Sequence, residues 1–218
     1  MKMSNRKRTF FLTILTILLP SIAGLLLWDQ LPEQIATHFN MHGQADGYSS
    51  RLFTIFGMPG LLALIQTFCY FVTTNDPKKE QIHSKIFTIV LWIVPVVTIV
   101  TMTMLYMNAL NIPVAIHSIV YILIGMLFIL LGNYMHKIKQ NYTIGIRVPW
   151  TLNSEQNWNQ THRFASWVFI LAGMICLIDT FFDSLAVMII SLLIASFLPI
   201  LYSFILYKKE NKVTETTR

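Results

Sequence analysis

Hydrophobic residues in this chain come in long, nearly unbroken runs, and short polar segments separate one run from the next. A helix of about twenty apolar residues crosses a hydrocarbon core of roughly 30 Å. Inside lipid a single segment satisfies its own backbone amides only as a helix. The pattern therefore predicts an all-α, polytopic membrane protein with six transmembrane helices. We expect the spans at about residues 9–28, 52–74, 84–108, 114–136, 163–183 and 185–207.

Composition agrees with a membrane scaffold. The 218 residues are 55% hydrophobic and only 12% charged, and the mean hydropathy is +0.59. A soluble domain typically carries about twice that charged fraction. Cys69 and Cys176 each lie inside a predicted span, with no spacing typical of a metal site or a disulfide framework. Both cysteines are therefore expected to be structural.

The basic residues are distributed unequally between the two sides of the predicted bundle. Of the 16 lysines and arginines, four precede span one, three lie between spans two and three, four lie between spans four and five, and four follow span six. Arg51 alone lies on the other side. The positive-inside rule then predicts cytoplasmic N- and C-termini and a cytoplasmic loop over residues 137–162. The net charge of +6 is thus a topology signal. It predicts contact with lipid headgroups and no direct nucleic-acid partner.

The outer loop, residues 29–51, offers the one arrangement that resembles a metal site. His38, His42 and Asp46 are spaced i, i+4 and i+8, which would align them on one helical face, and imidazoles with a carboxylate suit zinc or copper. Pro32 would open a short helix ahead of them. However, Gly43 and Gly47 interrupt the helix that would align the ligands. We therefore expect no metal and no cofactor, and keep the three residues as outer-loop candidates.

Proline and glycine positions inside the spans predict bent, closely packed helices. A proline frees a carbonyl one turn earlier, which neighbouring helices or water must satisfy. The bends would either serve only to pack the helices together or allow part of the bundle to move. Small residues seven apart in span four allow another helix to approach closely. The positions are Pro20, Pro59, Pro95 and Pro199 for the kinks and Gly125 and Gly132 for the close approach.

The sequence shows none of the common catalytic motifs. It has no His-Glu-x-x-His, no Gly-x-Ser-x-Gly and no glycine-rich phosphate loop. No carboxylate lies near the middle of a predicted span, which argues against an ion-coupled transporter. The chain is therefore not expected to be an enzyme.

The segment from Asn141 to Phe164 is polar and aromatic between two long apolar runs. Residues 142–148 alternate apolar and polar positions, which predicts a short extended piece, and Val148 precedes a proline and so favours an extended backbone. Asn153 or Ser154 can cap a new helix. On that helix Trp158 and His162, four residues apart, would share one face.

This segment resembles the SdpI immunity-protein family. The likeness rests on Gly132-Asn133, on Asn141-x-Thr143-Ile144-Gly145-Ile146-Arg147-x-Pro149-Trp150-Thr151-Leu152, and on Glu155, Trp158 and Thr161-His162-Arg163-Phe164. The outer loop resembles a small membrane domain often found before that segment. Its matching residues are Leu31-Pro32-x-x-Ile35-x-x-His38-Phe39 and Gly43-x-x-Asp46-Gly47. The two likenesses predict a two-helix unit over residues 1–75 and a four-helix unit over 76–218.

The resemblance implies a bacterial cytoplasmic-membrane protein that protects its cell against a secreted antimicrobial peptide, met on the outer face. In the family the role extends to signalling, in which the liganded protein holds a transcriptional repressor at the cytoplasmic face. The family is not built around known catalysis, so no catalytic residue is carried over. The residues carried over as candidate binding residues are Arg147, Pro149, Trp150, Thr151, Trp158, His162 and Arg163.

Two other classes of function stay open from the sequence. One is a peptide or lipid transporter or export facilitator, which needs a polar path through the bundle. The other is a membrane enzyme or lipid-binding scaffold, for which the outer-loop histidines are the only candidate chemistry. A gene for a small secreted peptide beside this one, together with a repressor gene, would favour immunity. For the candidate residues, a plain interfacial role for tryptophan and arginine remains the alternative.

Overall fold

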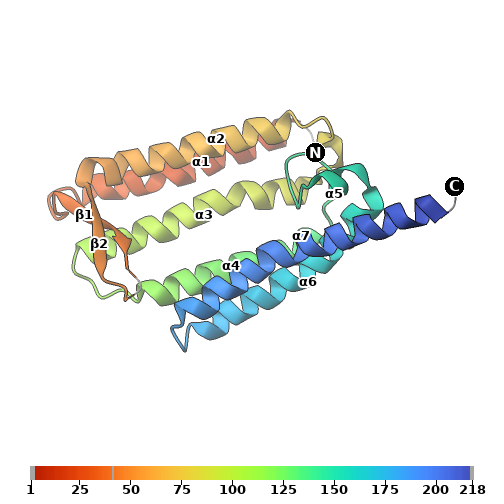
Figure 1. Cartoon of the computed structure of the whole chain (residues 1–218). Helices are drawn as coiled ribbons and strands as arrows, with labels where there is room; N and C mark the ends of the chain where they lie inside the picture. The colour runs from red at the N-terminus through yellow and green to blue at the C-terminus, as the bar shows by residue number, and fades with distance from the viewer. Residues whose placement is uncertain (1–2, 41, 217–218) are drawn as a thin grey trace. The chain divides into compact units, whose positions relative to one another are not determined.

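The computed structural model describes residues 3–40 and 42–216 and is built from long helices (Figure 1). Within these residues, six helices are long and apolar enough to cross a membrane, which confirms the predicted all-α, six-span class. They are α1 (Met3–Leu26), α2 (Met58–Thr74), α3 (Ser84–Ala109), α4 (Ile116–Met135), α6 (Glu155–Asp179) and α7 (Leu185–Thr216). Their bounds overlap the expected spans, but α1 begins at Met3 rather than at residue 9, α6 begins at Glu155 rather than at 163, and α7 ends at Thr216 rather than at 207.

Short elements join the spans. They are strands β1 (Gln34–Phe39) and β2 (Ala45–Ser50), a π-helical turn η1 (Phe53–Gly57), a 3-10 turn η2 (Lys79–Gln81) and helix α5 (Pro149–Asn153). The chain forms two compact units. Unit 1 comprises Met1–Val72 and Phe87–His117, and unit 2 comprises Thr73–Ile86 and Ser118–Arg218. The sequence-based boundary after residue 75 stays a prediction.

Polar side chains in unit 1 satisfy two carbonyls that prolines leave free. Pro95 has no N–H for the carbonyl of Leu91, and Nε2 of Gln66 donates to that carbonyl at 2.9 Å. Pro59 likewise has no N–H for the carbonyl of Ile55, and Oγ of Ser21 donates to it at 2.6 Å. In lipid an unpaired carbonyl costs several kcal/mol, so these bonds compensate for the N–H groups that the prolines lack. At both prolines a neighbouring helix thus supplies the missing donor.

The outer loop folds as an antiparallel hairpin of β1 and β2, not as the short helix expected after Pro32 (Figure 1). The turn explains the difference. Oδ1 of Asn40 accepts the backbone N–H groups of His42 at 2.9 Å and Gln44 at 3.0 Å, and Gly43 adopts a positive φ of 71°. Asparagine and glycine stabilise such a turn because the side chain mimics a backbone acceptor and glycine has no Cβ. These local bonds favour a hairpin over a helix.

Arg51, the one basic residue outside the predicted cytoplasmic side, has a local structural role. Its Nη1 donates to the carbonyls of Trp28 at 2.6 Å and Leu31 at 2.8 Å, and its guanidinium lies 4.3 Å from the centre of the Trp28 ring. Carbonyls near the end of a helix lack partners within the helix and attract cations. Arg51 therefore closes the turn that follows α1.

Glycines bring α4 and α6 together in unit 2, as the sequence predicts. A Cβ at Gly125 would lie 2.9 Å from the carbonyl oxygen of Gly173, and one at Gly132 would lie 2.8 Å from the carbonyl oxygen of Ser166. Oγ of Ser166 also donates to the carbonyl of Gly132 at 2.6 Å. Larger residues at these places would separate the helices, so the close approach predicted for Gly125 and Gly132 is confirmed. Next to this pair α7 runs back along α6 (Figure 1).

Candidate functional site

The polar segment between α4 and α6 folds around the side chain of Asn141, which is 1% exposed. Its Oδ1 accepts from the backbone N–H groups of Thr143 at 2.9 Å and Ile144 at 2.7 Å. Its Nδ2 donates to the carbonyls of Lys139 at 2.8 Å and Ile144 at 3.0 Å. Because one side chain supplies these bonds locally, residues 142–145 bend, and the extended piece predicted there is wrong.

A buried carboxylate from a distant part of unit 2 fixes the same turn. Oδ2 of Asp76 accepts from the backbone N–H of Tyr142 and from Oγ1 of Thr143, both at 2.9 Å. Its Oδ1 accepts from the backbone N–H of Lys78 at 2.7 Å. These three donors compensate for burying a carboxylate that is only 3% exposed. Asp76 is therefore a positioning residue for the segment.

His162 and Trp158 form the buried centre of the segment, on one face of α6 as predicted. Their rings stack with centroids 4.1 Å apart, and Trp158 is fully buried. Nε2 of His162 accepts from the backbone N–H of Ile146 at 3.0 Å, so the hydrogen of a neutral ring lies on Nδ1, which donates to the carbonyl of Trp158 at 2.8 Å. Nε1 of Trp158 donates to the carbonyl of Ile138 at 2.7 Å. Both ring nitrogens of His162 are engaged by the backbone.

Gly145 lies against this stacked pair. Its φ is 116°, and a Cβ built there would overlap the His162 ring and lie 3.1 Å from the Trp158 ring. Only glycine fits both the backbone conformation and the space. The Gly145 position is therefore required by the packing of the segment, which the sequence motif alone did not explain.

Helix α5 begins at Pro149 and is held by its own Thr151 and by Gln140, which precedes it. Val148 is extended, as the following proline predicts, with φ −114° and ψ 158°. Oγ1 of Thr151 accepts from the backbone N–H of Val148 at 3.1 Å. Nε2 of Gln140 donates to the carbonyls of Thr151 and Leu152, both at 2.9 Å. The Gln140 side chain therefore closes the C-terminal end of this short helix.

Trp150 connects α5 to α7. Its Nε1 donates to Oγ of Ser203 at 2.6 Å, and its ring packs against Phe204 with centroids 5.3 Å apart. The next helix begins at the predicted cap, since Oγ of Ser154 accepts from the backbone N–H of Asn157 at 3.1 Å. Nδ2 of Asn157 then donates to the carbonyl of Ser203 at 2.9 Å. Polar residues at the start of α6 are thus buried against α7, which is why hydropathy placed the span too late.

Arg147 and Arg163 are the charged candidate residues, and both are exposed, as is Pro149. Nη1 of Arg147 donates to the carbonyl of Tyr142 at 2.7 Å, and the rest of its guanidinium is exposed. Arg163 is exposed on α6 and makes no ion pair with any of the described residues. It lines a cleft of about 560 Å³ between α4 and α6. The other residues lining it are Asn133, His136, Asn159, Ser166, Trp167 and Ile170.

That cleft is the accessible part of the candidate site. Two amides, an imidazole and a guanidinium line it, and the Trp167 ring at its side is 66% exposed. Polar side chains of these types suit an acidic or hydrogen-bonding group of a ligand, and the Trp167 ring suits an apolar group next to it. The structure therefore divides the seven candidate residues. Trp150, Thr151, Trp158 and His162 hold the segment together, whereas Arg147, Pro149 and Arg163 are exposed.

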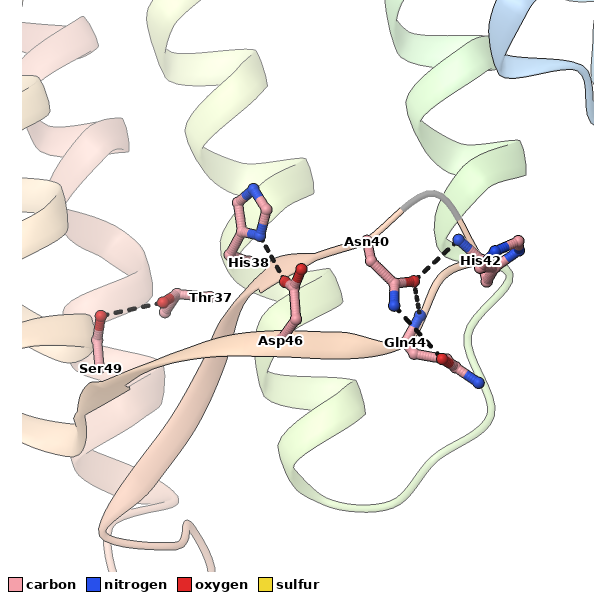
Figure 2. A network of polar contacts seen from close by, with 7 residues as sticks. All are labelled: Thr37, His38, Asn40, His42, Gln44, Asp46 and Ser49. Atoms are coloured by element: carbon pink, nitrogen blue, oxygen red, sulfur yellow. Dashed lines mark hydrogen bonds and ion pairs between the residues drawn. The ribbon is translucent and has the colours of Figure 1, made fainter.

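The outer-loop candidates lie on the hairpin, and only two of the three meet. Nδ1 of His38 and Oδ1 of Asp46 are 2.5 Å apart across the strands, while His42 lies at the turn (Figure 2). Oγ1 of Thr37 and Oγ of Ser49 form a second cross-strand bond at 3.0 Å (Figure 2). Among the described residues no group of three His, Cys, Asp or Glu could hold a metal ion. The helical alignment considered for His38, His42 and Asp46 does not form, since the residues lie in strands and a turn.

Six apolar helices and a polar segment folded on its own hydrogen bonds define a multi-pass protein of the cytoplasmic membrane, in contact with the lipid bilayer. The chain belongs to the SdpI/YfhL protein family, whose model matches residues 137–203. A domain of unknown function (DUF1648) matches residues 15–63. The chain is 30% identical over 207 residues to the immunity protein SdpI of Bacillus subtilis (strain 168). The aligned region covers 92% of this chain and 96% of that protein. No solved structure matches.

Proposed function

We propose that this protein gives its cell immunity against a secreted antimicrobial peptide. The observation that carries the proposal is the likeness to an immunity protein over 92% of this chain and 96% of the relative. The match therefore extends over nearly the full length of both proteins. A likeness of this extent supports a shared function for the whole molecule better than a match to one domain would.

The protection works by binding rather than by catalysis. The one buried histidine of the segment, His162, uses both ring nitrogens for backbone hydrogen bonds. A general base needs a nitrogen within hydrogen-bonding reach of a substrate. The segment instead presents exposed Arg147 and Arg163 on a rigid support. Arginine is one of the residues that most often carry the energy of a recognition surface.

The two polar regions suit two different partners. Under the predicted orientation the hairpin faces outward, where a secreted peptide arrives, and the segment faces the cytoplasm. We propose that the peptide is recognised from the outer side. We also propose that Arg147 and Arg163 offer a cytoplasmic surface to acidic groups of a partner, such as a transcriptional repressor held at the membrane. Guanidinium groups suit this role because they bind carboxylates with two parallel hydrogen bonds.

Expression in a sensitive bacterial strain tests the immunity function. The strain should carry either the full chain or an empty vector, and growth should be followed while candidate secreted peptides are added. We expect the full chain to raise the peptide concentration needed to stop growth. Equal sensitivity of the two strains to every candidate peptide, with the protein present in the membrane, would contradict the proposal.

Variants in the same strain test the outward-facing arginines. Because protection is proposed to need the partner bound at this surface, Arg147→Gln and Arg163→Gln should each lower resistance by roughly fivefold or more, the effect of losing about 1 kcal/mol of recognition energy. Membrane abundance, measured by immunoblot, should stay normal, since both side chains are exposed. Lys79→Gln, which removes a charge from another exposed position, is the matched control and should retain resistance. Full resistance in both arginine variants would leave the segment as a structural spacer.

A further inference from the structure

A second cleft in unit 2 gathers three lysines that the immunity function does not use. Its volume is about 470 Å³, and it lies between the start of α3 with the residues before it and the end of α4 with the residues after it. The side chains that matter are Glu80, His83, Lys85, Tyr134, Lys137 and Lys139. It shares no residue with the cleft at Arg163. It therefore needs its own explanation.

The Tyr134 ring organises the positive charge in this cleft. Nζ of Lys85 lies 5.3 Å from the ring centre, and Nζ of Lys137 lies 5.2 Å from it. Such cation–π contacts hold an ammonium group with about 0.5–1 kcal/mol at exposed sites. Two like charges beside one ring also repel each other. The contacts therefore hold the two lysines in place without neutralising them.

Negative charge is scarce in this cleft. Among the described residues Lys85, Lys137 and Lys139 form no ion pair with a carboxylate, and Glu80 is the one acidic residue that lines the cleft. Nδ1 of His83 accepts from the backbone N–H of Lys85 at 3.2 Å, so the hydrogen of a neutral His83 ring lies on Nε2 and adds another donor. Three ammonium groups and a ring N–H face one carboxylate. This balance suits an anionic ligand.

The backbone around the three lysines is fixed by hydrogen bonds. The carbonyl of Lys139 accepts from Nδ2 of Asn141 at 2.8 Å, and the N–H of Lys137 donates to the carbonyl of Tyr134 at 3.0 Å. On the other wall the N–H of Gln81 donates to the carbonyl of Lys78 at 2.9 Å. A ligand that enters the cleft therefore meets a preformed arrangement, which reduces the entropy lost on binding.

We propose that this cleft binds the phosphate of an anionic phospholipid headgroup. The lysines lie next to the ends of two spanning helices, the depth at which headgroups meet a membrane protein. Lysine ammonium groups bind phosphate as point charges. The carboxylate of Glu80 supplies an acceptor, which suits a headgroup that carries hydroxyls beside its phosphate. Phosphatidylglycerol has this chemistry.

Lipid binding by the purified full chain tests the proposal. Native mass spectrometry from zwitterionic micelles should be used to titrate the protein with phosphatidylglycerol, phosphatidylcholine and glycerol 3-phosphate. The test variant carries Lys85→Gln, Lys137→Gln and Lys139→Gln together. The matched control carries Lys7→Gln, Arg8→Gln and Lys209→Gln, which remove three exposed charges elsewhere. A variant with arginine at the three cleft positions preserves the charge.

We expect phosphatidylglycerol to bind the unaltered chain, and the cleft variant to bind it roughly 100-fold more weakly, since each basic residue near anionic lipid contributes about fivefold. The control and the arginine variant should bind it nearly as the unaltered chain does.

Glycerol 3-phosphate binding that matches the lipid and depends on the same lysines would identify a soluble phosphate as the ligand. Equal weakening in the cleft variant and the control, or no weakening in either, would overturn the proposal. Lys139→Gln alone repeats the test if the triple variant melts at a lower temperature without lipid.

Discussion

The outer hairpin and the segment from Asn141 to Phe164 are both polar interruptions between apolar spans, but they use their polar groups in opposite ways. In the hairpin the His38 and Asp46 side chains bond each other while 74% and 43% exposed. In the segment Asn141, Trp158 and His162 are each 1% exposed or less and bond to the backbone. A polar composition alone therefore does not distinguish a solvated loop from a buried support. The two are distinguished by whether their polar side chains are buried.

The largest expected difference between the two regions concerns the side of the membrane that each one faces. In a chain with Cys69→Ala and Cys176→Ala, a cysteine at Gln44 should label in intact cells with an impermeant maleimide. A cysteine at Asn153 should label only after the membrane is permeabilised, because the positive-inside rule places that segment in the cytoplasm. Both positions are exposed in the structure. Equal labelling of the two in intact cells would refute the predicted orientation.

Replacing the central asparagine should lower the free energy of unfolding more in the segment than in the hairpin. Asn141→Ala leaves buried N–H and carbonyl groups without partners, and we expect a loss of about 3–5 kcal/mol in the free energy of unfolding. Asn40→Ala, in the exposed hairpin turn, should cost about 1 kcal/mol, because water replaces the lost bonds. Thermal unfolding in micelles measures both. Similar losses for the two variants would show that the segment is no better buried than the hairpin.

The glycines with positive φ give a smaller contrast. Gly145→Ala meets an unfavourable backbone angle and also the rings of His162 and Trp158, so a loss of about 3 kcal/mol is expected. Gly43→Ala meets the backbone penalty alone, since its nearest neighbour, Nε2 of His117, lies 3.5 Å from the added Cβ. We expect about 1 kcal/mol there. The same unfolding measurement applies. A larger loss at Gly43 would reverse the comparison.

The smallest expected effect is on metal content. Replacing His38 and His42 together with alanine should leave the zinc and copper content of the purified protein unchanged, because the hairpin brings His38 to Asp46 and leaves His42 at the turn. Inductively coupled plasma mass spectrometry of the two proteins makes the comparison. Stoichiometric metal that disappears in the double variant would show that the outer loop is a metal site.

Hydropathy predicted the spans well because lipid leaves a chain few alternatives to a helix. The same measure placed the start of α6 at residue 163 instead of Glu155, since it counts Asn157 and His162 as polar whether or not they are buried. The hairpin was missed because its turn depends on Asn40 and on a register that no periodicity revealed. Local patterns did predict the cap at Ser154 and the shared face of Trp158 and His162.

The candidate site was less predictable because its support comes from residues far apart in the sequence. Asp76 bonds to Tyr142 across 66 positions, and Trp150 bonds to Ser203 across 53. No motif within one segment can reveal such a pair. Asn141 was visible as part of the family motif, but only the four hydrogen bonds of its amide to the backbone identify it as the centre of the turn. The outward position of Arg163 likewise depends on how α4 and α6 pack.

The bond between Gln66 and the carbonyl of Leu91 has a consequence for how the protein is made. If the helices enter the membrane in chain order, α2 arrives before α3, so the Gln66 amide first needs a partner in lipid other than the carbonyl of Leu91. Oγ1 of Thr13, on the earlier helix α1, accepts from the same Nε2 at 2.9 Å. The amide can therefore bond first to the helix already inserted and then to the one that follows. Insertion in chain order leaves this polar group paired at each stage.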